Sequence, residues 1–262
     1  MSQGTVHLKI TAGIAAIVFD RPQARNAMTW AMYEQLAGIC ERLQDAPGVR
    51  VATLRGAGGE AFVAGTDIEQ FKAFRNGDGG GEDGVAYERR IDHGIGLIER
   101  LPMPTVAVIE GWAIGGGLAM ATACDFRIAT PNARFGVPIA KTLGNCLSIA
   151  NLARLQAVFG APRVKRMLLL AELLGADEAL VCGFLAQVCE AGEIDAAAAK
   201  LCERLASLAP VTQSVVKEGL RRLVVHDLPE GEDLVHRAYA SRDFREGVEA
   251  FVGKRVPVWG GS

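Results

Sequence analysis

The first half of the chain alternates between short apolar stretches and amphipathic segments. Residues 6–10 and 14–19 are rich in apolar side chains and are joined by a short turn at Gly13, a pattern typical of a β-hairpin. Residues 29–44 have a helical period, and Thr29 is placed to act as the N-cap. The apolar positions of this helix are Met28, Met32, Leu36, Ile39 and Leu43.

The same alternation continues through the rest of this half. Further apolar stretches predict strands at 49–56, at 104–111 and, as two short strands, within 125–138. Helical patterns lie between them, at 65–74 and 85–101. Strands that alternate with helices favour an α/β layered fold with a largely parallel sheet.

From about residue 147 onward nearly every segment has a helical pattern, and only 184–190 interrupts them as a possible strand. We therefore expect an α/β core over residues 1–200 and an α-helical oligomerisation region over 201–262. Apolar stripes in this region, at positions such as Val215, Leu220 and Leu223, indicate an association surface.

One stretch, from Arg75 to Gly84, is rich in glycine and acidic residues and has no apolar anchor. This composition predicts a mobile surface loop. Because the stretch precedes the helix at 85–101, we expect it to act as an entrance lid that orders when a ligand binds.

Composition excludes several classes of function. The chain has 262 residues, half of them hydrophobic, and a net charge of −2 with Lys and Arg dispersed, so no nucleic-acid footprint is predicted. No apolar run approaches the ~20 residues that span a bilayer, and the N-terminus lacks the layout of a signal peptide. The six cysteines form no C-x-x-C pair, so we expect a cytoplasmic protein without a structural metal or disulfide.

Two glycine turns suggest chemistry. Gly115, Gly116 and Gly117 follow a predicted strand and open a predicted helix, and Gly65 does the same before Thr66. The first turn of a helix has backbone N–H groups without partners, and glycine lets another group approach them. Close packing of a helix on a sheet explains either turn alone. The two turns together favour an oxyanion hole with two N–H donors.

Four segments carry a resemblance to a known family. They are "FDRPQARNAM" (19–28), "FVAGTDI" (62–68), "PTVAVIEGWAIGGG" with "CDFRIA" (104–117 and 124–129) and "EGVEAFVGKRVPVW" (246–259). In this order and spacing they resemble the enoyl-CoA hydratase/isomerase, or crotonase, superfamily. The resemblance implies a spiral of ββα units followed by helices that form a homotrimer or a dimer of trimers.

The resemblance also implies a ligand and its site. The substrate is an acyl-CoA thioester, no other cofactor is implied, and the backbone N–H groups of Thr66 and Gly116 hold the thioester oxygen. The positions that match contacts with coenzyme A are Gln23, Ala24, Arg25, Ala64, Ile68 and, from a neighbouring subunit, Phe251 and Lys254.

Two positions depart from the family pattern. Enoyl-CoA hydratases carry a glutamate at each of the positions held here by Ala119 and Ile139. Each positioned acid or base contributes typically about 10²–10⁴-fold to the rate, so ordinary hydration is not expected. Isomerisation, decarboxylation, hydrolysis and an unusual hydration remain open. The alternative is a non-catalytic CoA-thioester binder or scaffold.

Other polar residues are candidates for the acid or base. Asp67 and Asp125 are expected to be structural. The helix at 85–101 carries Glu88, Asp92 and His93, of which we select Asp92, although a charge in mid-helix is more often on a solvated face. Asn145 and Cys146 lie at the predicted N-terminus of a helix. The Cys146 thiol either has a pKa lowered by that position or is a small residue packed in the core.

Overall fold

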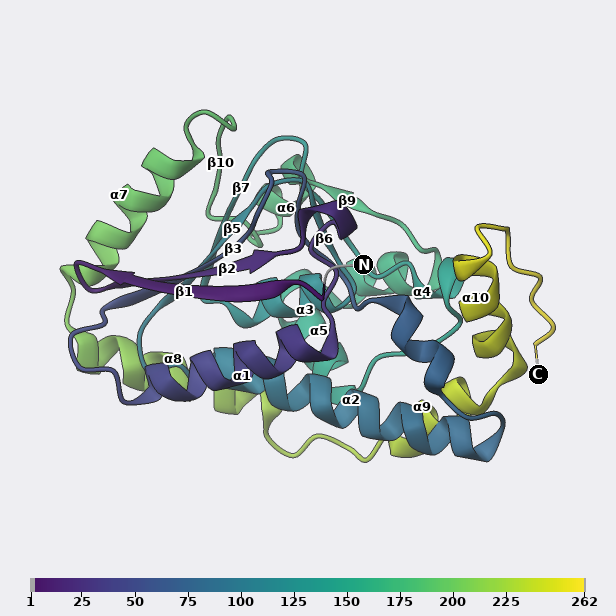
Figure 1. Cartoon of the computed structure of the whole chain (residues 1–262). Coiled ribbons are helices and arrows are strands. Elements are labelled where there is room, and N and C mark those ends of the chain that lie inside the picture. The colour runs from purple at the N-terminus through teal and green to yellow at the C-terminus, as the bar shows by residue number, and fades with distance from the viewer. Residues whose placement is uncertain (1–2, 262) are drawn as a thin grey trace.

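Two β-sheets form the centre of the protein, as the computed structural model of residues 3–261 shows (Figure 1). The larger sheet has the order β1-β2-β3-β5-β7-β10, with bounds Thr5–Thr11, Ile14–Asp20, Val51–Gly56, Thr105–Ile109, Phe126–Ala129 and Gln187–Val188. The smaller sheet has the order β4-β6-β8-β9, with bounds Ala61–Ala64, Trp112–Ile114, Arg134–Gly136 and Leu174–Gly175. Strand β1 pairs antiparallel with β2, as the hairpin pattern predicts, and the other pairs of the larger sheet are parallel. In the smaller sheet β4, β6 and β8 are parallel and β9 is antiparallel to β8.

The chain alternates between the two sheets. Strands β3, β5 and β7 lie in the larger sheet, and each is followed by a strand of the smaller sheet, β4, β6 and β8. A helical segment follows each pair, so the core is a spiral of ββα turns. The α/β architecture predicted from the sequence is confirmed.

Helices surround the sheets and fill most of the second half of the chain. They are α1 (Trp30–Gln44), α2 (Asp78–Glu99), α3 (Gly116–Ala123), α4 (Ile139–Thr142), α5 (Ile149–Leu169), α6 (Ala176–Val181), α7 (Ile194–Ala206), α8 (Pro210–Val225), α9 (Glu232–Ala240) and α10 (Arg242–Val252), with 3₁₀ turns η1 (Pro22–Ala24) and η2 (Ile68–Ala73). The boundary expected after residue 200 falls inside α7. No helix within residues 3–261 has the length and apolar character needed to cross a membrane.

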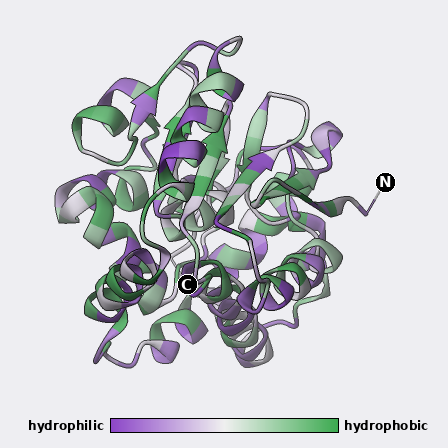
Figure 2. Ribbon diagram, turned by 90° about the vertical axis from the view of Figure 1, so that its left-hand side faces the viewer, coloured by the Kyte–Doolittle hydropathy of each residue, from purple (hydrophilic) through white to green (hydrophobic). Residues whose placement is uncertain are grey.

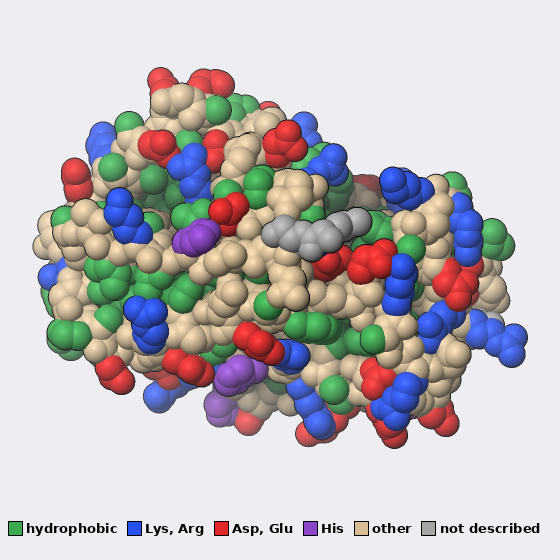
Figure 3. Space-filling view, viewed as in Figure 1, with side chains coloured by type: hydrophobic (Ala, Val, Ile, Leu, Met, Phe, Trp, Pro, Cys, Tyr) green, Lys and Arg blue, Asp and Glu red, His purple; other side chains and the backbone are tan. Residues whose placement is uncertain are grey.

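Both faces of the larger sheet are covered. Helix α1 buries its apolar stripe below the sheet, and the Thr29 hydroxyl accepts a hydrogen bond from the Met32 N–H at 3.3 Å, which confirms the predicted N-cap. Helix α7 packs on the opposite face against β3, β5 and β7 (Figure 1). The strands between these layers are mainly hydrophobic (Figure 2). Charges of both signs are dispersed over the surface in Figure 3.

The glycine-rich stretch is not the mobile loop that its composition predicts. Residues 78–84 form the first two turns of α2, and Gly80, Gly81 and Gly84 are buried. The Arg75 side chain and backbone N–H bind the Asp83 carboxylate and tie down the start of the helix. The expectation of a lid is therefore wrong.

These glycines form a seam on which α9 packs. A Cβ atom on Gly81 would lie 2.5 Å from the His236 ring, and one on Gly84 would lie 2.2 Å from Cγ of Tyr239. Only glycine, whose side chain is a single hydrogen atom, allows α9 to approach α2 this closely. The composition that suggests disorder therefore serves close helix packing.

We predict that Gly84→Ala destabilises the protein by about 1–3 kcal/mol, because the added methyl group overlaps the Tyr239 ring. Gly94→Ala, on the same helix, is the matched control, because a Cβ atom there meets nothing within 4 Å. It should stabilise the protein by up to about 1 kcal/mol. Urea denaturation of both variants measures the difference, and equal stability of the two would contradict the seam.

Candidate active site

Each of the three glycines at the start of α3 meets a different structural requirement. Gly115 has a φ of 57°, which favours glycine, and it precedes the helix. A Cβ atom on Gly116 would lie 3.0 Å from the Tyr33 hydroxyl, and one on Gly117 would lie 2.0 Å from the Val63 carbonyl oxygen. The triplet therefore serves close packing on β4 as well as access to the helix N-terminus.

The two glycine turns abut. A Cβ atom on Gly115 would lie 3.7 Å from Cα of Gly65, which has a φ of 87°. The hydrogen bonds from Met28 N to Gly65 O and from Asp67 N to Met28 O hold the Gly65 turn in place. Among residues 3–261, no backbone acceptor takes the N–H of Thr66 or of Gly116. Two N–H groups on facing turns can stabilise one negatively charged oxygen.

Both turns line a cavity of about 760 Å³. All the positions matched to coenzyme A contacts line it as well: Gln23, Ala24, Arg25, Ala64, Ile68, Phe251 and Lys254. Within one chain, Phe251 of α10 and Lys254, which follows that helix, line the chain's own cavity. Ala119 and Ile139 also face the cavity, with other apolar side chains such as Ile91, Val137 and Leu143.

The cationic groups of the cavity have different surroundings. Arg21 forms an ion pair with Asp67 at 2.8 Å. Asp67 also caps η2 by accepting from the Glu69 N–H, as predicted. Arg25 lies over the Trp112 ring, 5.7 Å from its centroid, and Lys254 is exposed. Arg25 and Lys254 are therefore positioned to meet an anionic ligand.

Asp125 has the structural role expected of it. Its carboxylate accepts hydrogen bonds from the Thr105 N–H at 2.7 Å and from Lys217 Nζ at 2.6 Å. Asp125 thereby joins β5 to α8 and does not line the cavity.

Glu88 lines the cavity together with the glycine turns, and unlike Asp67, the other acidic residue in the lining, it is not paired with Arg21. Its side chain is 4% exposed, and no cation pairs with it within residues 3–261. Tyr239 Oη donates to Glu88 Oε1 at 2.8 Å, and the Ser148 N–H donates to Oε2 at 3.1 Å. Burial raises the pKa of Glu88 to about 8, although both hydrogen bonds oppose the rise.

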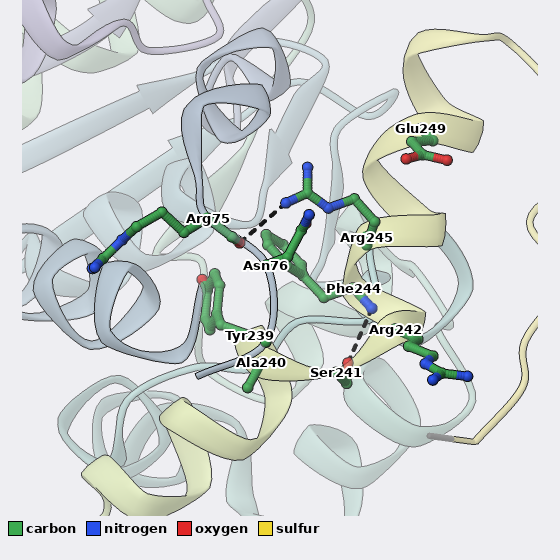
Figure 4. Close-up of a pocket in the computed structure, with 10 residues that line it drawn as sticks. Arg75, Asn76, Tyr239, Ala240, Ser241, Arg242, Phe244, Arg245 and Glu249 are labelled. Atoms are coloured by element: carbon green, nitrogen blue, oxygen red, sulfur yellow. Dashed lines mark hydrogen bonds between the residues drawn. The ribbon is translucent and has the colours of Figure 1, made fainter. Parts of the chain in front are cut away.

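The Tyr239 hydroxyl has a second partner besides Glu88, because Asn145 Nδ2 donates to it at 3.1 Å. Just beyond α9, Arg245 of α10 donates to the carbonyl oxygen of Phe74 and to that of Arg75, the second of which Figure 4 shows. These bonds hold α10 against the segment that precedes α2. Tyr239 also forms part of the wall of a second, smaller cavity of about 430 Å³ between these segments (Figure 4).

Asp92, selected from the sequence, does not line the main cavity. Its carboxylate accepts from the Ser148 hydroxyl at 2.8 Å and from Arg154 at 3.2 Å, and Arg154 also binds Glu99. Asp92 is thus part of an ion-pair network between α2 and α5. His93 is exposed and also lies outside the cavity.

Cys146 lies outside the main cavity as well. Ser148, not Cys146, caps α5. Burial raises the pKa of the Cys146 thiol to about 12, so the alternative of a small packed residue fits and that of a lowered pKa does not.

The sequence contained a signal for Glu88. In α2 the buried positions Gly84 and Ile91 lie four and three residues from Glu88, and Ile95 lies seven residues from it, so this carboxyl belongs to the apolar face of the helix. Asp92, one turn after Glu88, is only half-buried. The contribution of Tyr239, which is 151 residues away along the chain, has no local signal.

We predict that Glu88 makes stability depend on pH. Its pKa is raised from 4.5 to about 8 by folding, so its contribution is complete below pH 4.5 and is lost as the pH rises through 8. The free energy of unfolding should fall less steeply between pH 5 and 8 in Glu88→Gln than in the unmodified protein. Urea denaturation at several pH values across this range measures the free energy of unfolding and gives its slope against pH. Glu203→Gln, on the exposed face of α7, should keep the original slope.

Comparison with known proteins agrees with this arrangement. The family model for enoyl-CoA hydratase/isomerase matches residues 9–262. The chain is 32% identical to a carnitinyl-CoA dehydratase of Proteus mirabilis over the whole of both chains. It is 29% identical to a short-chain-enoyl-CoA hydratase of Clostridium acetobutylicum, over 97% of each chain.

Solved structures give the same result. A methylmalonyl-CoA decarboxylase in complex with 2-nitronate-propionyl-CoA superposes with a TM-score of 0.88 at 26% identity, over 98% of each chain. An enoyl-CoA hydratase/carnitine racemase of Magnetospirillum magneticum superposes with a TM-score of 0.79 at 32% identity, over 100% of this chain and 97% of that one. The spiral of ββα turns is thus the crotonase fold, and the chain belongs to the enoyl-CoA hydratase/isomerase family.

Proposed function

We propose that the protein is an enzyme that moves a proton to or from the carbon next to the carbonyl of an acyl-CoA thioester. The N–H groups of Thr66 and Gly116 hold the thioester oxygen, and Glu88 carries the proton. The observation that supports this most is that Glu88 is a buried carboxyl, unpaired with any cation of residues 3–261, and lines the same cavity as both turns.

Binding of the coenzyme A part follows from the same cavity. Gln23, Ala24, Arg25, Phe251 and Lys254 all line it. The two exposed cations among them, Arg25 and Lys254, suit the phosphates of coenzyme A. The thioester is the substrate in this proposal, and no further cofactor is required.

A single carboxyl favours isomerisation of a double bond. Ionised Glu88 takes a proton from C2 of a 3-enoyl-CoA, and the electron pair of that bond forms a dienolate held by Thr66 and Gly116. The same carboxyl then returns the proton to C4 and leaves a 2-enoyl-CoA. Hydration requires that water be activated as well, and Ala119 and Ile139 supply no group for that.

Decarboxylation is the second candidate, because a pKa of about 8 keeps most of Glu88 neutral at pH 7. A neutral carboxyl can give a proton to the substrate but cannot take one from it. Loss of CO₂ from a 2-carboxyacyl-CoA leaves its electron pair in an enolate, and Glu88 then gives its proton to C2. The likeness to methylmalonyl-CoA decarboxylase favours this candidate.

The two reactions depend on pH in opposite directions. With a 3-enoyl-CoA, kcat should rise through about pH 8, because ionised Glu88 is required. With a 2-carboxyacyl-CoA such as methylmalonyl-CoA, kcat should fall over the same range. The isomerisation leaves the mass unchanged, so it is followed by the ultraviolet absorbance of the conjugated 2-enoyl thioester, and the decarboxylation is followed by mass spectrometry. Both measurements across pH 6–9 decide between the two reactions. Binding of a CoA thioester without turnover of either would identify a non-catalytic binder.

We predict that Glu88→Gln lowers kcat by about 10²–10⁴-fold and leaves the calorimetric affinity for the acyl-CoA within a few-fold. Asp92→Asn and Cys146→Ala are the controls, because both side chains lie outside the cavity, and they should keep most of the activity. Gly116→Pro removes a backbone N–H donor and should abolish turnover. Full activity of Glu88→Gln would refute the proposed role of Glu88.

We also propose that the chain forms a trimer or a dimer of trimers. Helix α8 exposes a set of large apolar side chains along its length: Val211, Val215, Val216, Leu220 and Leu223. Such a face favours association, because its burial removes apolar surface from water. Sedimentation velocity at micromolar concentration should give three or six chains per particle. A single monomeric species would contradict this prediction.

A further inference from the structure

Three hydroxyl groups meet beside the N-terminus of α3. Thr66 Oγ1 lies 2.9 Å from Tyr33 Oη of α1 and 2.8 Å from Tyr87 Oη of α2. Within residues 3–261, neither phenol has a second hydrogen-bond partner. The three hydroxyls carry three protons but share two hydrogen bonds, so one O–H is left to donate elsewhere.

Chemistry decides which O–H that is. A phenol is the stronger acid and therefore the better donor, whereas the oxygen of an aliphatic alcohol accepts two hydrogen bonds readily. Burial raises the pKa of both Tyr33 and Tyr87, so both phenols keep their protons. Both phenols therefore donate to Thr66, and the hydroxyl proton of Thr66 is the one without an acceptor.

That proton lies next to the facing glycine turns. Thr66 Oγ1 is 3.8 Å from the position that a Cβ atom on Gly116 would take, and Thr66 is half-buried on the wall of the large cavity. On the basis of the proposed function, we propose that the Thr66 hydroxyl is a third donor to the thioester oxygen, beside the N–H groups of Thr66 and Gly116.

The arrangement favours the charged form of the substrate. Two phenols that donate to one oxygen polarise its own O–H bond and strengthen it as a donor. The bond to a developing oxyanion is stronger than the bond to a neutral carbonyl oxygen, because one partner is charged. The Thr66 hydroxyl therefore acts mainly on the enolate.

Acetoacetyl-CoA is the probe for this donor, because its ionisation to an enolate is followed by ultraviolet absorbance. The unmodified protein should lower the pKa of the bound ligand. Thr66→Val, which keeps the shape of the side chain and the backbone N–H, should raise that pKa again by about 1–2 units, or roughly tenfold to hundredfold in acidity. Thr66→Ala should do the same, and Thr66→Ser should retain the shift.

A purely structural role for the cluster has a different outcome. The double variant Tyr33→Phe/Tyr87→Phe removes both hydrogen bonds that tie Thr66 to α1 and α2 but leaves the Thr66 hydroxyl. If Thr66 is a donor, the double variant keeps more than half of the pKa shift. Loss of the shift in the double variant, or its persistence in both Thr66→Val and Thr66→Ala, overturns the proposal.

The titration separates this inference from the role of Glu88. Glu88→Gln should leave the ionisation shift of acetoacetyl-CoA near its original size, because that carboxyl is not a donor to the thioester oxygen. If Glu88→Gln remains fully active, the proposed function fails while the Thr66 result stands. If Thr66→Val ionises the ligand normally, the third donor fails while the role of Glu88 stands.

Discussion

The close approach of α9 to α2 is the contact on which the candidate site depends. Gly84 has no side chain, so the Tyr239 ring lies against the backbone of α2, and one helical turn later its hydroxyl meets Glu88. The same ring shields Glu88 from water and supplies one of its hydrogen bonds. Backbone packing between two helices therefore determines the acidity of a side chain that neither helix would bury alone.

Glu88 and Asp92 show how the surroundings divide two carboxyls of one helix. They are one turn apart, and the residue between them in the fold, Ser148, donates to both. Asp92 is paired with Arg154, whereas the described residues that donate to Glu88 are neutral. Burial raises the pKa of each carboxyl. The Ser148 hydroxyl and the Arg154 cation oppose the rise for Asp92, and the Tyr239 hydroxyl and the Ser148 N–H oppose it for Glu88. Asp92 is therefore suited to a structural role and Glu88 to proton transfer.

Patterns within a few residues predicted most of the fold. The hairpin, the N-cap at Thr29 and the alternation of strand and helix depend on local spacing, and the structure confirms them. Glycine was the ambiguous residue, because the same lack of a side chain serves a flexible loop and a tight helix seam. The stretch around Gly80 and Gly84 was misjudged for that reason. Its true partner, α9, lies some 150 residues further along the chain and left no local trace.

The distribution of the site along the chain has a consequence for its biosynthesis. The ββα turns that carry Thr66, Glu88 and Gly116 leave the ribosome well before α9 and α10, which supply Tyr239, Phe251 and Lys254. Domains generally fold as units. Until α9 emerges, Tyr239 is absent and cannot donate to Glu88 or pack on Gly84. The surroundings that raise the pKa of Glu88 are therefore complete only when translation is nearly finished.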